Sequence, residues 1–411
     1  DPLLLGTGGR RHKNVSRYIR TDPEERFISP GSYFLFRVFN ETDKSSALWY
    51  YHQYFDDIFR TPPELTPSMY GSVTKAANAK RFIYTVEDFI NPPDLYFSLN
   101  PGDYHSARLK LSSVNPQQSQ YLWGTAELFS WKAYNGKTAT GIVYKPDNCD
   151  PKKKYPVIVY FYEKLSQGLH DYKEPAPIRS AINIPYFVSN GYLLFLPDIT
   201  YKTGYPGQSA YDYVVSGARA LVKKGWADST RIAVQGHSWG GYQAAQLATM
   251  TKLFKAVWAG APVANMTSAY GGIRWESGVN RQFQYEKTQS RIGATLWEKP
   301  ELYIKNSPLF HLDKVTAPMV ILHNDADGAV PWYQGIELFT GLRRLGKKVW
   351  MFNYNGQGHG LTQRPDMLDY HIRMQQFFDW ILRGAKPARW ITEGVPAIKK
   401  GKDWGLEIVD E

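Results

Sequence analysis

The sequence predicts an α/β fold in which a doubly wound, mostly parallel sheet follows an all-β segment. Three observations support this prediction. Apolar strand-like runs alternate with helical stretches beyond about residue 123, which is the order of a parallel sheet covered by helices. Short strands separated by turns dominate the part before it. A Gly-X-Ser-X-Gly turn joins one apolar run to the start of a helical stretch.

The first part of the chain is predicted to consist of β-hairpin units. Tyr33–Phe39 and Ala47–Tyr54 flank a polar turn, and Arg81–Thr85 and Asp94–Ser98 form a second pair. Such pairs are the building units of sheet blades, but a closed β-propeller needs at least four blades. We therefore expect residues 1–122 to form a β-hairpin segment that is a partial β-propeller.

A hairpin opens the second part, where Leu128–Tyr134 and Lys137–Tyr144 flank Asn135-Gly136, a strong two-residue turn signal. Residues 123–390 are predicted to form the second domain, and residues 391–411 a C-terminal tail. The apolar runs predicted as strands of the parallel sheet are Val157–Phe161, Tyr192–Leu196, Ile232–Gln235, Ala256–Ala259, Met319–His323 and Val349–Tyr354. The predicted helices are Tyr211–Lys224, Tyr242–Met250, Tyr333–Leu345 and Asp366–Leu382.

Composition narrows the classes of partner. The net charge is +11, but the Lys and Arg residues are scattered and no nucleic-acid-binding motif accompanies them, so we expect no nucleic-acid partner. The single cysteine, Cys149, excludes an intrachain disulfide, and no His-Glu-X-X-His or Walker motif is present. We therefore expect no metal and no cofactor.

Location and assembly are less constrained. The apolar runs are too short to cross a bilayer, so no membrane association is expected. No feature indicates an oligomer. These features leave the compartment open.

The segment from Arg231 to Met250 reads as a strand, a Gly-His-Ser-Trp-Gly turn and a helix. This is the local structure of a nucleophile elbow, in which a sharp turn exposes the hydroxyl of Ser238. Gly236 and Gly240 remove side chains that would collide around it. The elbow identifies the predicted sheet as an α/β-hydrolase sheet, and Ser238 is the candidate nucleophile.

A serine hydroxyl needs a general base and an acid that orients the base, in the chain order Ser, Asp, His. Two acids, Asp325 and Asp327, follow the strand Met319–His323. We favour Asp327, because Asp325 lies nearer the strand end and is placed to cap the turn. The alternative is that both carboxylates form an Asx turn.

For the base, His359 lies in a glycine-rich loop, Gly356-Gln-Gly-His-Gly360, just after the last predicted strand. Its rival is His371, which falls inside the predicted helix Asp366–Leu382, where a histidine is more often a packing residue. His359 is therefore the predicted base.

Attack on a carbonyl creates an oxyanion that needs preorganised hydrogen-bond donors. One donor is predicted to be the backbone N–H of Trp239. The other is expected from the loop after Val157–Val159, where the Tyr162 hydroxyl is a candidate. Packing at the strand end is an equally good interpretation of Tyr162 from the sequence alone.

The motifs around Ser238, Asp327 and His359, in this order and spacing, resemble those of the prolyl oligopeptidase family of serine peptidases. The resemblance covers roughly residues 127–384 and is strengthened by Ala261-Pro-Val263. The segments Ser268–Trp275 and Asn306–Pro308 resemble a bacterial branch of the family, which implies the periplasm or the cytoplasm of a bacterium as the compartment. The resemblance to the family implies a β-propeller in front of the hydrolase domain that admits peptides. Either the chain is the C-terminal portion of a longer protein, or the second domain works without the complete propeller that usually restricts access to peptides.

The resemblance also implies roles for individual residues. Tyr162 would donate its hydroxyl to the oxyanion hole, although Glu163 departs from the turn that commonly follows this aromatic residue. The residues implied to line the pocket for the residue before the scissile bond are Trp239, Val263, Tyr270 and Val330, each of which the sequence alone also allows in the core.

The expected function is hydrolysis of short peptides through an acyl-enzyme, with endopeptidase, dipeptidyl and acyl-aminoacyl modes unresolved. A carboxylesterase is the first alternative, although the His-Gly-Gly-Gly motif of esterases is absent near Val157. A catalytically idle binding module on the same fold is the second.

Overall fold

The computed structural model describes residues 14–22, 24, 26–27, 31–52, 63–101 and 108–410. The chain divides into two compact units. The first comprises Asp1–Leu128 together with Ser166–Glu174, and the second comprises Phe129–Leu165 and Pro175–Glu411. The chain therefore leaves the second unit after Leu165 and re-enters it at Pro175, nine residues that belong to the first unit.

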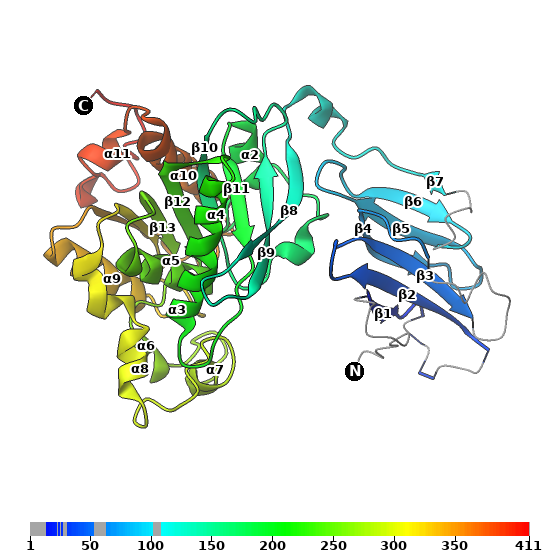
Figure 1. The fold of residues 1–411 in the computed structure, drawn as a ribbon, viewed down its shortest axis with the longest axis horizontal. Coiled ribbons are helices and arrows are strands. Elements are labelled where there is room, and N and C mark those ends of the chain that lie inside the picture. The colour runs from blue at the N-terminus through cyan, green and yellow to red at the C-terminus, as the bar shows by residue number, and fades with distance from the viewer. Residues whose placement is uncertain are drawn as a thin grey trace. The chain divides into compact units, whose positions relative to one another are not determined.

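The first unit is all-β and contains two antiparallel sheets (Figure 1). The three-stranded sheet has the order β1 (Asn14–Ile19), β2 (Tyr33–Asn40), β3 (Ser46–His52). The four-stranded sheet has the order β4 (Met69–Lys75), β5 (Phe82–Glu87), β6 (Asp94–Ser98), β7 (Leu109–Lys110). Four strands is the usual number in one propeller blade.

One aromatic and aliphatic core joins these two sheets. Leu35 and Tyr50 from the first sheet pack with Tyr70, Phe82 and Tyr84 from the second. The Tyr50 and Phe82 rings meet edge to face, with centroids 5.2 Å apart.

The segment Ser166–Glu174, called the excursion below, contacts the rest of the first unit through Tyr172. Its ring stacks on Trp123 at a centroid distance of 5.7 Å, and its hydroxyl lies 2.8 Å from the Asn115 Nδ2 donor.

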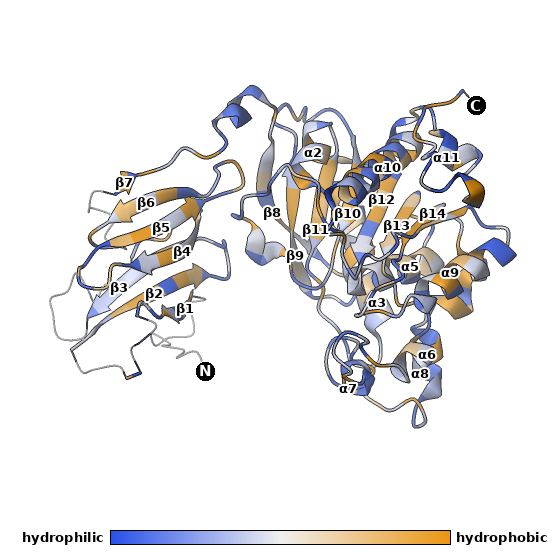
Figure 2. Ribbon diagram, turned by 180° about the vertical axis from the view of Figure 1, so that it is seen from behind, coloured by the Kyte–Doolittle hydropathy of each residue, from blue (hydrophilic) through white to orange (hydrophobic). Residues whose placement is uncertain are grey.

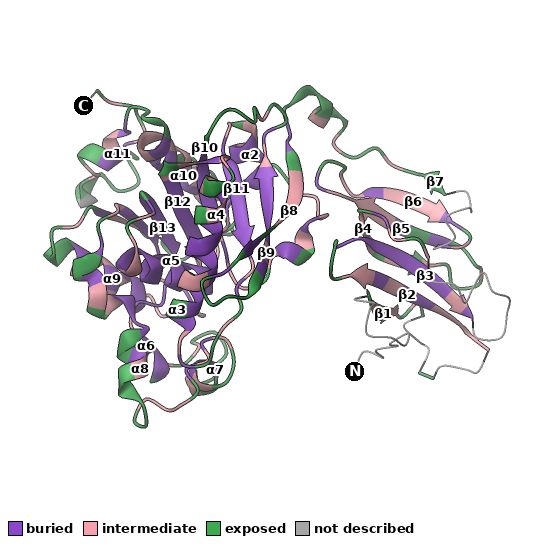
Figure 3. Ribbon diagram, viewed as in Figure 1, coloured by how far each residue is buried: buried purple, intermediate pink, exposed green. Residues whose placement is uncertain are grey.

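The second unit is built on an eight-stranded sheet with the order β15-β14-β13-β12-β10-β11-β9-β8. Its strands are β8 (Thr125–Lys132), β9 (Thr138–Lys145), β10 (Tyr155–Tyr160), β11 (Leu193–Pro197), β12 (Ala227–His237), β13 (Ala256–Gly260), β14 (Met319–Leu322) and β15 (Val349–Phe352). The strands β11, β10, β12, β13, β14 and β15 pair in parallel, while β9 pairs antiparallel with β11. The central strands are apolar and buried (Figures 2 and 3), as unbroken apolar runs require.

Helices cover both faces of this sheet. The larger helices are α4 (Ser216–Lys223), α5 (Trp239–Met250), α9 (Tyr333–Arg344) and α10 (Arg364–Arg383). Alternate residues of β13 show the two faces, because successive side chains of a strand point opposite ways. Val257 shares a core with residues of α4, α5 and α9, whereas Trp258 packs against Phe377 and Phe378 of α10.

Shorter helices complete the unit. They are α2 (Ile184–Ser189), α3 (Pro206–Ala210), α6 (Met266–Tyr270), α7 (Gln282–Glu286), α8 (Pro300–Lys305) and α11 (Arg389–Thr392). Beyond α11, the Trp404 carbonyl accepts a hydrogen bond of 2.9 Å from Arg373 Nη2, which ties the end of the chain to α10.

The predicted fold class is confirmed: an α/β-hydrolase sheet follows an all-β segment. The predicted helix Tyr211–Lys224 starts with a π-helical turn, Tyr211–Val215, before α4. The predicted strand Ala47–Tyr54 corresponds to β3, and its last two residues lie outside the described residues.

Candidate active site

Ser238 stands between the end of β12 and the first residue of α5, in a backbone conformation that few non-glycine residues adopt. Its φ and ψ are 59° and −117°. Positive φ brings the Cβ of an L-residue close to the backbone and is costly, so it persists only where the surroundings fix it. The Ser238 N–H donates to the Gly260 carbonyl at 2.8 Å, and the Ser238 carbonyl accepts from Tyr242 N–H at 2.9 Å.

The glycines around Ser238 allow the chain to approach itself. A Cβ on Gly236 would lie 2.2 Å from the Gly240 carbonyl oxygen, and one on Gly240 would lie 2.4 Å from the Phe161 carbonyl oxygen. Backbone atoms cannot yield at such distances. Any side chain at either position would therefore displace the elbow.

Asp327 and His359 lie on loops after the neighbouring strands β14 and β15. His359 Nδ1 donates to Asp327 Oδ2 at 2.8 Å. The other carboxylate oxygen accepts the N–H groups of Ala329 and Val330, each at 2.8 Å. Because the carboxylate only accepts, the His359 proton is on Nδ1, which leaves a lone pair on Nε2.

The Asp327 carboxylate is 1% exposed. Burial by itself raises its pKa, but hydrogen bonds from His323 and His359 outweigh this effect, and the pKa falls well below the usual range. Asp327 is consequently ionised at any pH near neutrality, and its negative charge faces His359 Nδ1.

The two rival residues have different partners. Asp325 accepts the Gly356 N–H at 2.7 Å and the Asn355 side-chain amide at 3.0 Å, which anchors the loop before His359. His371 lies on α10, where its Nε2 accepts the Ile178 N–H at 2.8 Å.

His237, the last residue of β12, packs against the base His359. Its ring centroid lies 4.7 Å from that of His359. Burial is the main reason why the pKa of His237 falls to about 3, and the neighbouring His359 lowers it further. A neutral His237 beside His359 adds no competing positive charge.

The loops that carry Ser238, Asp327 and His359 follow the carboxyl ends of β12, β14 and β15, the edge where α/β sheets bind ligands.

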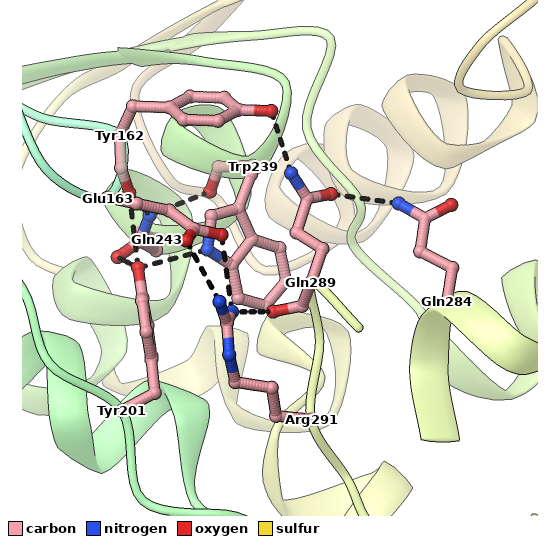
Figure 4. Close-up of polar contacts among 8 residues, drawn as sticks. All are labelled: Tyr162, Glu163, Tyr201, Trp239, Gln243, Gln284, Gln289 and Arg291. Carbon is pink, nitrogen blue, oxygen red and sulfur yellow. Dashed lines mark hydrogen bonds and ion pairs between the residues drawn. The ribbon is translucent and has the colours of Figure 1, made fainter. Parts of the chain in front are cut away.

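Tyr162 follows β10, and three contacts fix its loop. Its carbonyl accepts from Gln243 Nε2 at 2.7 Å and from the Tyr201 hydroxyl at 3.1 Å. Its own hydroxyl accepts from Gln289 Nε2 at 2.7 Å (Figure 4). The Tyr162 proton is therefore free to point to another acceptor. Trp239 supplies the first amide of α5, one of the N–H groups that a helix leaves without an internal partner.

Sequence reasoning missed several of these supporting residues. Glu163, which departs from the expected turn, forms a two-pronged ion pair with Arg291, with N–O distances of 2.9 and 3.2 Å (Figure 4). Gln289 and Arg291 lie in a stretch after α7 that has neither strand nor helix periodicity. Only the fold brings them to Tyr162.

A cavity lies beside Ser238. It is lined by Ser238, Trp239, Val263, Arg274, Arg281, Gln284, Tyr285, Gln289, Ser290, Ala329 and Val330. Three of the four residues assigned to the pocket from the sequence are among them. The fourth, Tyr270, packs behind Tyr285 at a ring centroid distance of 6.3 Å, and its hydroxyl donates to Glu286 at 2.7 Å.

Within the described part of the chain, no group of three or more His, Cys, Asp or Glu side chains has a geometry suited to a metal ion. Likewise, none of the helices in the described ranges combines the length and apolar character that crossing a membrane demands.

The fold and the elbow together define an α/β-hydrolase. A model of the prolyl oligopeptidase family matches residues 183–385. This match, over 203 of the 411 residues, agrees with the family resemblance that the sequence motifs indicated.

Individual relatives agree with this assignment. The chain is 23% identical over 347 residues to the uncharacterized peptidase YuxL of Bacillus subtilis, covering 82% of the chain and 50% of the relative. It is 25% identical over 275 residues to dipeptidyl-peptidase 5 of Porphyromonas endodontalis, covering 61% of the chain and 36% of the relative. The chain thus matches half or less of the length of these relatives.

A solved structure of similar fold is the acylaminoacyl peptidase of Pyrococcus horikoshii. The TM-score is 0.68 at 19% identity, and the match covers 96% of this chain and 64% of that one. At this identity the likeness establishes the fold.

Proposed function

We propose that the protein is a serine peptidase that cleaves short peptides through an acyl-enzyme. The observation that carries the proposal is the hydrogen bond from His359 Nδ1 to the buried Asp327 carboxylate, at the same sheet edge as the Ser238 elbow. This pair is what a serine needs to become a nucleophile at neutral pH.

In the proposed reaction, Ser238 Oγ attacks the carbonyl carbon while His359 Nε2 takes the hydroxyl proton. The backbone N–H of Trp239 and the hydroxyl of Tyr162 stabilise the oxyanion. His359 then gives its proton to the leaving amine as the C–N bond breaks. Water, deprotonated by His359, hydrolyses the ester of Ser238 and restores the enzyme.

Peptides are the proposed substrates because of the family whose model matches residues 183–385 and because of the names of the chain's relatives. Those names include a dipeptidyl-peptidase and an acylaminoacyl peptidase. The proposal covers dipeptidyl cleavage, acylaminoacyl cleavage and internal cleavage. A peptide panel with free and blocked N-termini separates the three modes in one assay.

Labelling with a fluorophosphonate tests the nucleophile, and hydrolysis of a blocked peptide amide tests the reaction. We expect label on Ser238, peptide cleavage by the wild type, and loss of both in Ser238→Ala. A Ser238→Ala variant that cleaves at the wild-type rate would refute the assignment. Turnover of a simple acyl ester without any amide cleavage favours a carboxylesterase, and absence of label favours an idle binding module.

A further inference from the structure

Two arginines line the cavity beside Ser238, and they make it cationic. Arg281 immediately precedes α7 and is 2% exposed. Arg274 is half-buried and comes from the loop after α6. Neither the sequence motifs nor the proposed reaction assigns a role to Arg281 or Arg274.

Arg281 has no anionic partner among the residues that the structure describes. Its Nη1 donates to the Ala329 carbonyl, and its Nη2 lies 3.4 Å from the Tyr285 hydroxyl. Its Nε is buried and has no hydrogen-bond partner. Among the ion pairs of the described residues, none joins a carboxylate to Arg281 or Arg274. Burying a guanidinium without a counter-charge is costly, so the site favours an incoming anion.

Three acidic side chains on the surrounding segments are engaged with other partners. Glu163 pairs with Arg291, Glu286 accepts the Tyr270 hydroxyl, and Asp327 accepts His359 Nδ1. None of these carboxylates is therefore held against Arg281. No ion pair among the described residues supplies this counter-charge, so a carboxylate of the substrate can do so.

The remaining lining of the cavity combines apolar walls with buried polar groups. Val263 and Val330 supply apolar walls. Gln284 and Ser290 are buried polar residues of the same lining, and Arg274 Nη2 donates to Gln284 Oε1 at 3.2 Å. This polarity is unsuited to a proline ring or a leucine side chain, because buried donors would lose their partners.

We propose that this cavity binds the carboxylate of an aspartate or glutamate immediately before the scissile bond. The proposal rests on the proposed peptidase function, because Ser238 lines the same cavity and would attack the carbonyl of that residue. A guanidinium binds a carboxylate through charge-assisted hydrogen bonds, which are stronger than neutral ones. A neutral isostere would leave the buried charge unpaired.

The first measurement compares blocked peptide amides that differ only at this residue: Glu, Gln, Asp, Asn, Leu and Pro. We expect kcat/KM for Glu to exceed that for Gln by about tenfold or more, and Asp to exceed Asn likewise, from the strength of hydrogen bonds between charged groups. Equal rates for each acid and its amide, or a preference for Leu or Pro, would overturn the proposal.

Variants assign the preference to the arginine. Arg281→Gln should bring the Glu to Gln ratio of kcat/KM close to one, and Arg281→Lys should retain part of it. Arg344→Gln removes an exposed arginine from the last turn of α9 and should leave the ratio as in the wild type. Should Arg281→Gln fail to fold, Arg274→Gln takes its place with a smaller expected decrease. An unchanged ratio in a folded Arg281→Gln protein contradicts the assignment.

A binding measurement separates this inference from the catalytic one. Calorimetry with Ser238→Ala and blocked peptides containing Glu or Gln needs no turnover. Tighter binding of the Glu peptide supports the cavity assignment even if the wild type hydrolyses none of the amides, which would refute the peptidase function alone. Equal binding of both peptides refutes the cavity assignment whatever the hydrolysis assay gives.

Discussion

At the scale of the residue, Ser238, Asp327 and His359 depend on atoms that are fixed before any substrate arrives. The elbow holds Ser238 at φ 59°, and Asp327 receives two backbone N–H groups and His359 Nδ1. Such preorganisation lowers the barrier because little rearrangement is needed in the transition state.

Asp327→Asn should lower kcat by about 10⁴, because an amide cannot hold His359 with its proton on Nδ1. Asp325→Asn is the matched control, since Asp325 contacts Asn355 and Gly356 rather than His359. Steady-state kinetics of the two variants and the wild type on one peptide amide show which carboxylate orients His359. A larger loss in Asp325→Asn would reverse our choice of acid.

Tyr162→Phe should lower kcat by about 10² or more with little change in KM, because the hydroxyl would act on the oxyanion rather than on bound substrate. The exposed Tyr333 offers a control, Tyr333→Phe, that removes a hydroxyl at a distance from Tyr162 in the sequence. Comparison of kcat and KM for the three proteins tests this role. A change in KM alone would mean that Tyr162 binds substrate and does not stabilise the oxyanion.

At the scale of the element, the contact between α5 and β13 sets where Ser238 stands. Gly241 in α5 faces the Gly260 carbonyl at the end of β13, and a Cβ there would lie 2.1 Å from that oxygen. The same carbonyl accepts the Ser238 N–H. The helix must therefore lie this close to the strand for the elbow to form.

Gly241→Ala should lower the free energy of unfolding by about 1–3 kcal/mol, as overpacking of a dense interior does. Gly271→Ala is the control, because its φ is −75° and the nearest atom to an added Cβ is 3.9 Å away. Its effect should stay within about 0.5 kcal/mol. Chemical denaturation measures both, and equal stabilities of the two variants would contradict the close-contact argument.

Prediction from sequence succeeded for elements whose pattern is long and regular, and failed for short ones. Strand β13 and the segment Ile232–Val234 of β12 are apolar on both faces, so an unbroken apolar run predicts them. The strand β4 was missed because Gly71 and a shift in register interrupt its pairing. Helices α6, α7 and α8 have five or six residues, too few for a period of 3.6 to be recognised.

The same limit explains which site residues were found. Ser238, Asp327 and His359 each follow a strand and lie in a glycine-containing motif, so their position could be inferred. Gln289 and Arg281 flank α7 in an irregular segment, and their contacts with Tyr162 and Ala329 join parts of the chain far apart in sequence. No local pattern encodes such a contact.

At the scale of the whole molecule, buried neutral histidines link stability to pH. Burial lowers the pKa of His371 to about 4, below its ordinary value of 6.5. In the unfolded chain the same histidine takes up a proton near pH 6.5. Between these two values the unfolded state binds more protons, so stability falls as the pH falls. His237, with a pKa of about 3, acts in the same direction.

The free energy of unfolding should therefore decrease from pH 7 to pH 5, and His371→Gln should decrease less steeply, by up to about 1.4 kcal/mol per pH unit. Glutamine retains an acceptor for the Ile178 N–H. Urea denaturation at pH 7, 6 and 5 gives both slopes. Identical slopes for the two proteins would show that His371 does not titrate in this range.

The excursion Ser166–Glu174 limits how freely the two units can be exchanged in evolution or in engineering. The chain crosses from one unit to the other three times, at Leu128, Leu165 and Glu174, and the middle crossing follows Tyr162 by only three residues. A simple cut after Leu128 would leave nine residues of the first unit embedded in the second. The first unit is thus not a detachable module, and any graft of a different one has to replace two separate stretches of sequence.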